Sequence, residues 1–265
     1  MIERLLCRKQ NMKPADQANW WKIINNIDHY VSRTSVEGAT QIVRQKILSI
    51  TQGKRAAYSW SGGKDSLVIA DICQSIGITK CQCIITDVEY PKWESYMRLN
   101  APPVCKMVEV GFGLSYLREH PEMNFPRGKT FQKWYQMVQR NNFTAYMKDE
   151  NLDVLILGHR TIDGNVCGIN GIRRNASGGI LYAPLHAWSH EMLFAYLFYH
   201  GIELPFIYKW KNGFYQGTHW WPARKVDSVE QGYQEVYEID KSVVINAAAV
   251  LPSAKKFLES VKNNV

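Results

Sequence analysis

Residues 57–67 read AYSWSGGKDSL, and this stretch decides the fold class. We expect Arg55–Trp60 to form a strand, and the apolar spacing of Lys64–Ile76 predicts a helix shortly after it. Gly62 and Gly63 carry no Cβ, so the backbone between strand and helix can take positive φ and bring its N–H groups close to an anion. Because the positive end of the helix dipole points at the same place, the sequence predicts a phosphate-binding loop.

The polar side chains of this loop suit the same task. Lys64 supplies a mobile positive charge, and Asp65 can cap the helix or help to hold a divalent cation. A Walker A loop has four residues between its first glycine and Gly-Lys-Ser/Thr, so the spacing here is different. The alternative is an ordinary glycine turn capped by serine. The loop residues predicted to bind a nucleotide are Ser59, Ser61, Gly62, Gly63, Lys64, Asp65 and Ser66.

Length and composition favour one main α/β domain with small appendages. The chain has 265 residues, of which 46% are hydrophobic, and this suffices for a sizeable core. No apolar run is long enough to cross a bilayer, and Met1–Lys13 lacks the apolar segment and cleavage site of a secretory signal. We therefore expect a cytoplasmic protein without a membrane partner. The predicted domains are an N-terminal helical extension (1–54), a nucleotide-binding α/β domain (55–210), and an aromatic-rich loop with a C-terminal helical tail packed on the core (211–265).

Cysteine usage and charge narrow the class of partner. Six cysteines without CxxC spacing predict reduced thiols rather than a disulfide framework or a zinc ribbon. The formal net charge of +8 favours anionic partners, of which a nucleotide is the first. A nucleic acid stays open as a partner, because Trp210, Trp220 and Trp221 lie near basic residues and could stack on bases. Such aromatic residues more often belong to a core.

Strand and helix patterns alternate along the chain. Apolar positions at helical spacing over 17–52 predict two helices before the loop, and Thr130–Glu150 predicts a later helix. Strands are expected at Lys80–Asp87, Met107–Val110 and Leu152–Leu157. This alternation predicts a doubly wound, mostly parallel sheet with helices on both faces. Ligands of such sheets bind beyond the carboxyl ends of the strands.

The second half of the chain has a weaker pattern. Gly164–Gly179 is rich in glycine and asparagine, and we expect a long loop over the site. Ser189–His200 predicts a helix with Ser189 as its N-cap. The segment after Pro205 is aromatic and loop-rich through Lys225, and Ser253–Lys262 predicts a short amphipathic helix.

Three further groups of residues join the predicted site. Asp87 ends the second strand, from where a carboxylate can reach a ribose hydroxyl, an ammonium or a metal, although a turn residue would also fit. Gly158 permits close approach to a nucleotide, and Arg160 beside it offers charge. Arg173 and Arg174 suit bidentate contacts to phosphate or sulfate oxygens, with solvated surface arginines as the alternative.

The SGGKDS loop resembles the signature of the ATP pyrophosphatase (adenine nucleotide alpha hydrolase) superfamily, called the PP-loop. The later blocks TDVEYP (86–91), GIRR (171–174) and YAPLHAWS (182–189) resemble the phosphoadenosine phosphosulfate (PAPS) reductase-like branch of that superfamily. The likeness covers roughly 55–210. It implies that Ser61–Ser66 hold nucleotide phosphates and that ATP is cut between its α and β phosphates.

Departures from the branch matter for the chemistry. Its reductases use a cysteine near the C-terminus as nucleophile, and this chain has none after Cys167. Cluster-bearing members need four cysteine ligands, whereas only Cys81-Gln82-Cys83 comes near such a motif, so no iron–sulfur cluster is expected. Cys167, in the polar loop near Arg173, is the one thiol with a setting for reactivity.

Three functions remain open from the sequence. The leading hypothesis is an enzyme that uses ATP and Mg²⁺ and adenylates an acceptor, either a small anion such as sulfate or a nucleic acid. The alternatives are a sulfonucleotide reductase-like enzyme without the C-terminal cysteine, or a nucleotide- or nucleic-acid-binding module without turnover. A homo-oligomer or a partner subunit also stays open. The predicted catalytic residues are Lys64, Asp65, Asp87 and Arg173, and Asp65 is the predicted metal ligand.

Overall fold

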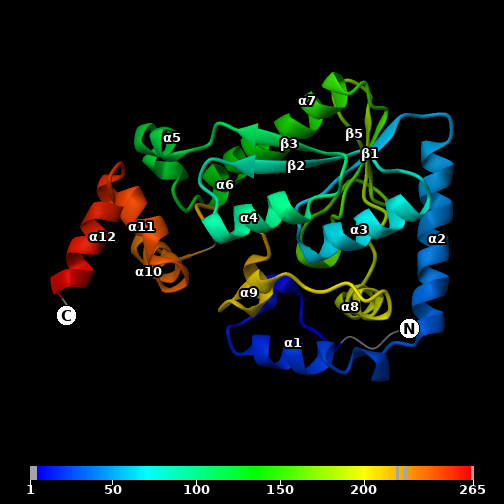
Figure 1. Cartoon of the computed structure of the whole chain (residues 1–265), viewed down its shortest axis with the longest axis horizontal. Helices are drawn as coiled ribbons and strands as arrows, with labels where there is room; N and C mark the ends of the chain where they lie inside the picture. The colour runs from blue at the N-terminus through cyan, green and yellow to red at the C-terminus, as the bar shows by residue number, and fades with distance from the viewer. Residues whose placement is uncertain (1–4, 219–220, 224–225, 264–265) are drawn as a thin grey trace. The chain divides into compact units, whose positions relative to one another are not determined.

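The protein folds around a six-stranded sheet. The structure is a computed structural model that describes residues 5–218, 221–223 and 226–263 (Figure 1). Within these residues the strand order is β3-β2-β1-β4-β6-β5, and β5 is antiparallel to β6 while β1 pairs in parallel with both β2 and β4. The predicted α/β class with a mostly parallel sheet is therefore confirmed. The strands are β1 (Ala56–Ser59), β2 (Cys81–Thr86), β3 (Cys105–Val110), β4 (Val154–Ile156), β5 (Ile172–Arg174) and β6 (Ile180–Tyr182).

The strand order reverses between β1 and β4. The chain runs from β1 to β2 and β3 on one side of β1, whereas β4 returns to the other side. The register pairs Ala56 with Val154 and Tyr58 with Ile156, so the two strands end level with each other. The segments that follow them therefore leave the sheet side by side. In doubly wound sheets this switch in strand order is where ligands bind.

The described chain divides into two compact units, each built from several segments. The first contains Met1–Cys83, Asn100–Lys106 and Phe143–Gly217. The second contains Ile84–Leu99, Met107–Asn142 and Thr218–Val265. The domain boundaries expected at 54 and 210 stay a prediction.

The helices of the first unit form where the sequence predicts them. α1 (Asp16–Ile24) and α2 (Arg33–Thr51) precede β1, and α3 (Lys64–Ser75) follows the glycine loop. Ser189 caps α8 (His190–Tyr199) by accepting a hydrogen bond from the Met192 N–H. Eight consecutive α8 residues, His190–Leu197, are buried, so α8 is a central helix of this unit rather than a surface helix. It packs against α1, α2 and α3.

The second unit contains helices that the sequence patterns did not predict. α4 (Pro91–Asn100) begins at a proline, which suits the first helical position. Val229–Ile239 and Lys241–Ala248 form α10 and α11, although only the last helix was expected in this region. Further helices of this unit are α5 (Leu114–Glu119), α6 (Gly128–Tyr135), a π-helical turn (Gln136–Arg140) and α12 (Pro252–Asn263). The π-helical turn leads into α7 (Asn141–Asp149), which belongs to the first unit from Phe143 onward.

The expected long loop at Gly164–Gly179 contains a strand. β5 pairs with β6 through a tight turn, in which the Gly178 N–H donates to the Asn175 carbonyl at 3.1 Å. A three-residue strand in a sequence rich in glycine and asparagine has little β-propensity of its own. Pairing with β6 stabilises it, and β6 has parallel pairing to β4 on its other side. The loop prediction is wrong for this part.

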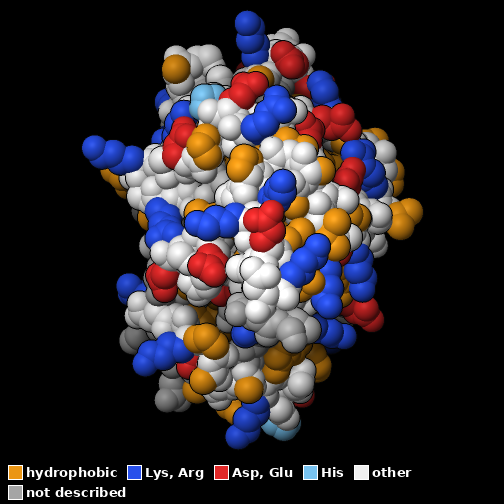
Figure 2. All heavy atoms as spheres, turned by 90° about the vertical axis from the view of Figure 1, so that its left-hand side faces the viewer, with side chains coloured by type: hydrophobic (Ala, Val, Ile, Leu, Met, Phe, Trp, Pro, Cys, Tyr) orange, Lys and Arg blue, Asp and Glu red, His pale blue; other side chains and the backbone are white. Residues whose placement is uncertain are grey.

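Surface charge and aromatic residues bear on the nucleic-acid alternative. Figure 2 shows Lys and Arg side chains spread among Asp and Glu over the face that it displays. Trp221 is buried against Phe125 and Tyr233 in the second unit, so it is a core residue. Trp210 is half-buried, and Trp220 lies outside the described residues. A nucleic-acid partner stays a prediction.

None of the described helices combines the length and the apolar content that crossing a bilayer requires.

Candidate functional site

One of the two glycines in the loop is left-handed. Gly62 takes φ +67°, whereas Gly63 is the N-cap of α3 in an extended conformation, with φ −80° and ψ 161°. Only Gly62 uses the freedom to take positive φ, because the helix entry needs an extended residue at Gly63. Both glycines are buried.

Ser66 fixes the shape of the loop. Its hydroxyl donates to the Gly63 carbonyl at 2.9 Å and accepts a hydrogen bond from the Ser61 N–H at 3.1 Å. The Ser61 hydroxyl lies 3.4 Å from the Ser66 hydroxyl oxygen. The two serines predicted as phosphate donors thus bond to each other and to the loop backbone. Ser59, the third predicted serine, is the last residue of β1 and is half-buried.

The amides of both glycines remain open. The Lys64 N–H donates to the Tyr208 hydroxyl at 2.9 Å, and burial raises the pKa of Tyr208 well above its usual value, so this phenol stays neutral. By contrast, no hydrogen bond within the described part of the chain engages the N–H of Gly62 or Gly63. These two donors lie at the positive end of the α3 dipole. Buried amides are nearly always paired, so this pair marks a place for an anion.

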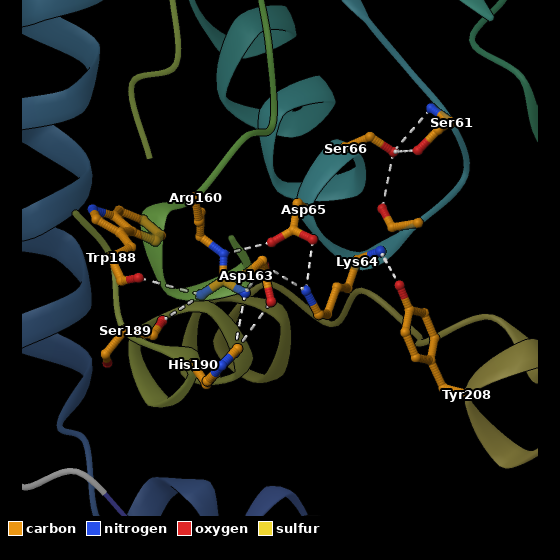
Figure 3. Close-up of polar contacts among 11 residues, drawn as sticks. Ser61, Lys64, Asp65, Ser66, Arg160, Asp163, Trp188, Ser189, His190 and Tyr208 are labelled. Carbon is orange, nitrogen blue, oxygen red and sulfur yellow. Dashed lines mark hydrogen bonds and ion pairs between the residues drawn. The ribbon is translucent and has the colours of Figure 1, made fainter. Parts of the chain in front are cut away.

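Four charged side chains form a closed cluster beside the loop (Figure 3). Lys64 Nζ lies 2.6 Å from Asp65 Oδ2 and 3.2 Å from Asp163 Oδ2. Arg160 Nε lies 2.6 Å from Asp65 Oδ1, and Arg160 Nη2 lies 2.7 Å from Asp163 Oδ2. Each cation thus contacts both carboxylates, and the four charges sum to zero.

Arg160 holds three segments of the chain together. It is 0% exposed, and its Nη1 donates to the carbonyls of Trp188 and Ser189 at 3.2 and 3.0 Å. Nη2 also donates to His190 Nδ1 at 3.2 Å, since an arginine has no acceptor. Together with the two carboxylate contacts, these bonds use all five N–H donors of the guanidinium. Arg160 therefore positions the site instead of presenting a spare donor to a nucleotide.

Asp163 completes the cluster and was not predicted. Burial by itself would raise the pKa of this carboxyl, but the charges of Arg160 and Lys64 outweigh burial and hold the pKa well below its usual range. Asp163 ends the 3-10 turn η5 (Thr161–Asp163), three residues after Arg160. One sequence signal could have identified Asp163. It is an acidic residue in the turn that directly follows Arg160.

His190 lines the cluster as a neutral ring. Burial, followed by the nearby charge of Arg160, lowers its pKa to about 2. Because Nδ1 accepts from Arg160, the ring proton is assigned to Nε2. The Trp20 ring packs at 4.6 Å between centroids, on the face that α1 provides. A neutral buried imidazole acts as an acceptor for Arg160.

Asp65 does not fit the role of metal ligand. Both oxygens of its carboxylate are in ion pairs, one with Arg160 and one with Lys64. The described residues also contain no group of three or more histidine, cysteine, aspartate or glutamate side chains that could hold a metal ion. The cluster therefore does not fit a resident Mg²⁺, and no chemical step below uses one.

Gly158 lets the first turn of α3 approach the segment after β4. A Cβ at this position would lie 3.1 Å from the Asp65 carbonyl carbon and 3.2 Å from the Asp65 Cβ. This is tighter than an ordinary contact, so any side chain would push Asp65 away from Arg160. Gly158 thus lies close to the protein backbone at Asp65.

The other predicted site residues lie outside this cluster. Asp87 is exposed, belongs to the second unit and packs against Gly113, whose added Cβ would lie 3.2 Å from Asp87 Oδ2. Arg174 in β5 donates to the Gly178 carbonyl at 3.0 Å. Within the described chain, neither Arg173 nor Arg174 has a hydrogen bond or ion pair with the cluster. Their predicted roles stay predictions.

Cys167 does not have the setting of a reactive thiol. Its side chain is buried, and its sulfur lies 3.6 Å from the Leu181 carbonyl oxygen. Burial raises the pKa of this thiol, although the charge of Arg173 acts in the opposite direction. At neutral pH Cys167 is therefore protonated.

Comparison with known proteins gives a distant match. No protein-family model and no curated protein matches the sequence. Among solved structures, the chain is similar to the PAPS reductase from Candida auris in a phosphate complex, with a TM-score of 0.49 and 15% identity. The match covers 68% of this chain and 92% of that chain.

Removing one carboxylate from the cluster should destabilise the fold. In Asp163→Asn the buried charges of Arg160 and Lys64 lose a partner, and we expect the free energy of unfolding to fall by about 3 to 5 kcal/mol. Urea denaturation followed by circular dichroism measures this change. Arg55→Gln is the control, because it breaks an ion pair that is open to solvent, and we expect little change there. Equal stability of Asp163→Asn and the wild type would contradict the account.

We expect the folded protein to lose stability in mild acid because of His190. The folded pKa is about 2, whereas an unfolded histidine has a pKa of about 6.5, so between these values only the unfolded chain holds this proton. The free energy of unfolding should therefore fall by about 1.4 kcal/mol for each pH unit below 6.5. His190→Asn removes this contribution, so its stability deficit should shrink by about 2 kcal/mol between pH 7 and pH 5.

The control for this pH dependence is the exposed His29. His29→Asn should keep the wild-type slope in urea denaturation at each pH. If His190→Asn kept that slope as well, the assignment of a neutral buried His190 would be wrong.

Proposed function

We propose that this protein is an enzyme of the ATP pyrophosphatase type, which binds ATP at Ser61–Ser66 and adenylates an acceptor. One observation carries the proposal. The N–H groups of Gly62 and Gly63 have no protein partner within the described residues, although both glycines are buried and Ser66 bonds to the backbone of Ser61 and Gly63. Anions are the natural ligands of such amides at the start of a helix.

The electrostatics of the site support a phosphate group at this position. α3 has 12 residues, and its aligned peptide dipoles place roughly half a positive charge at its first turn. Lys64 adds a full charge that its two carboxylate partners already hold in place. The donors are thus arranged before the ligand arrives, which is the condition for strong electrostatic stabilisation of a transition state.

The proposed reaction is a displacement at the α-phosphorus of ATP. A lone pair of the acceptor forms a bond to this phosphorus, and the bond from phosphorus to the α,β-bridging oxygen breaks. Pyrophosphate leaves with that electron pair, and the acceptor proton goes to solvent. The loop amides and Lys64 would stabilise the negative charge that builds on the leaving phosphates.

A single methyl group in the loop should test nucleotide binding. Gly62→Ala places a Cβ on a residue at φ +67° and distorts the amide cradle, so the affinity for ATP should fall at least tenfold. Isothermal titration calorimetry with ATP measures the affinity. Assays of pyrophosphate and AMP release, with Mg²⁺ in solution and candidate acceptors present, then test turnover.

Gly53→Ala is the matched control for backbone strain. Gly53 has nearly the same φ, +66°, but lies in an exposed turn where an added Cβ meets nothing within 4 Å. This variant should suffer a similar conformational cost and bind ATP as the wild type does. A wild-type protein that does not bind ATP, or equal binding by Gly62→Ala, would overturn the proposal.

A further inference from the structure

A segment far from the glycine loop in sequence reaches the same site. Residues 5–12, here called the N-terminal strap, are tied to α8 by Glu191. One oxygen of this fully buried carboxylate, Oε1, accepts hydrogen bonds from the N–H groups of Leu5 and Leu6, both at 2.8 Å. At the far end of the strap, Met12 is buried, and the N–H of the next residue donates to the Asp16 carboxylate at 2.7 Å. The strap is thus fixed at both ends.

The middle of the strap packs onto the ionic cluster. The 3-10 turn η1 (Lys9–Asn11) contacts η5, which carries Asp163, and α9 (Gly213–Gln216). Figure 1 shows the blue strap passing beside α9. A Cβ at Gly217, where φ is +60°, would lie 3.2 Å from Lys9 Nζ. Because position 217 is a glycine, the ammonium group has room to lie there.

Lys9 brings a charge that the cluster does not balance. Lys64, Arg160, Asp65 and Asp163 sum to zero, and His190 is neutral. No carboxylate of the described residues lies within 4.0 Å of Lys9 Nζ. Burial lowers the pKa of Lys9, and the charges of Lys64 and Arg160 add to this effect, against the attraction of Asp163 and Asp65. The site therefore has a surplus cation that an arriving anion would stabilise.

We propose that Lys9 is a further anion-binding residue of this site, whose ammonium group contacts a phosphate oxygen of the nucleotide bound at the glycine loop. This inference rests on the function proposed above. It assigns part of the phosphate recognition to the N-terminal strap, outside the α/β domain that carries the loop. Contact with a phosphate dianion supplies the partner that the described residues do not give to Lys9.

A binding role and a structural role of Lys9 lead to different results in its variants. Lys9→Gln removes the surplus charge, so ATP affinity in isothermal titration calorimetry should fall about tenfold or more, since a charge-assisted contact to phosphate is lost. The stability of the ligand-free variant in urea should be equal to or above that of the wild type, because no carboxylate of the described part of the chain loses an ion-pair partner. Lys9→Arg should recover most of the affinity.

The exposed Lys13 provides the matched control. Lys13→Gln removes the same charge four residues along the chain, where the side chain faces solvent, and should leave ATP binding unchanged. A second measurement repeats the ATP titrations at rising pH. Because burial lowers the pKa of Lys9, its charge is lost at a lower pH than that of an ordinary lysine, so the affinity advantage of the wild type over Lys9→Gln should shrink as the pH rises.

The outcomes distinguish the two proposals. If the wild type does not bind ATP, the proposed function fails and this inference fails with it. If the wild type binds ATP and Lys9→Gln binds it equally well, only the role of Lys9 is overturned. If Lys9→Gln loses affinity and stability together, and Lys9→Arg does not recover the affinity, Lys9 is structural and the inference is again wrong.

Discussion

The site depends on two cations that share two buried carboxylates. Lys64 and Arg160 each contact Asp65 and Asp163, and three of these four side chains are almost completely shielded from water. Burying charge costs several kcal/mol per ion, so the arrangement persists only with close contacts and with the remaining donors satisfied. Arg160 meets this condition through the carbonyls at the start of α8. The cluster thereby fixes the first turn of α3, the turn after β4 and the α8 N-terminus in one arrangement.

The loop conformation follows from this constraint. With Asp65 held by Arg160, the first turn of α3 has a fixed direction, and Gly158 allows the close approach that this requires. Ser66 closes the loop onto itself, and the Gly62 and Gly63 amides are left without a hydrogen-bond partner among the described residues. A site that is organised before its ligand arrives loses less entropy on binding and provides donors without rearrangement. The cost of this organisation falls on folding rather than on binding.

Local sequence patterns predicted the local features of this architecture. The alternation of strands and helices gave the α/β class, and Ser189 was identified as the N-cap of α8 because capping depends on neighbouring residues. The role of Arg160 was not predictable in this way, since its partner Asp65 lies 95 positions away and only the strand order brings the two together. Lys9 lies on a strap whose place depends on Glu191, which is 186 positions from Leu5. Contacts of this kind leave no periodic signal in a single sequence.

The most direct test of the account is a titration of ¹⁵N-labelled protein with ATP, followed by amide NMR. The account predicts that the resonances of Gly62 and Gly63 shift more than those of other glycines, and that their hydrogen exchange slows as both amides gain an acceptor. Saturable ATP binding that leaves both resonances in place would contradict it, because the phosphates would then occupy another part of the molecule.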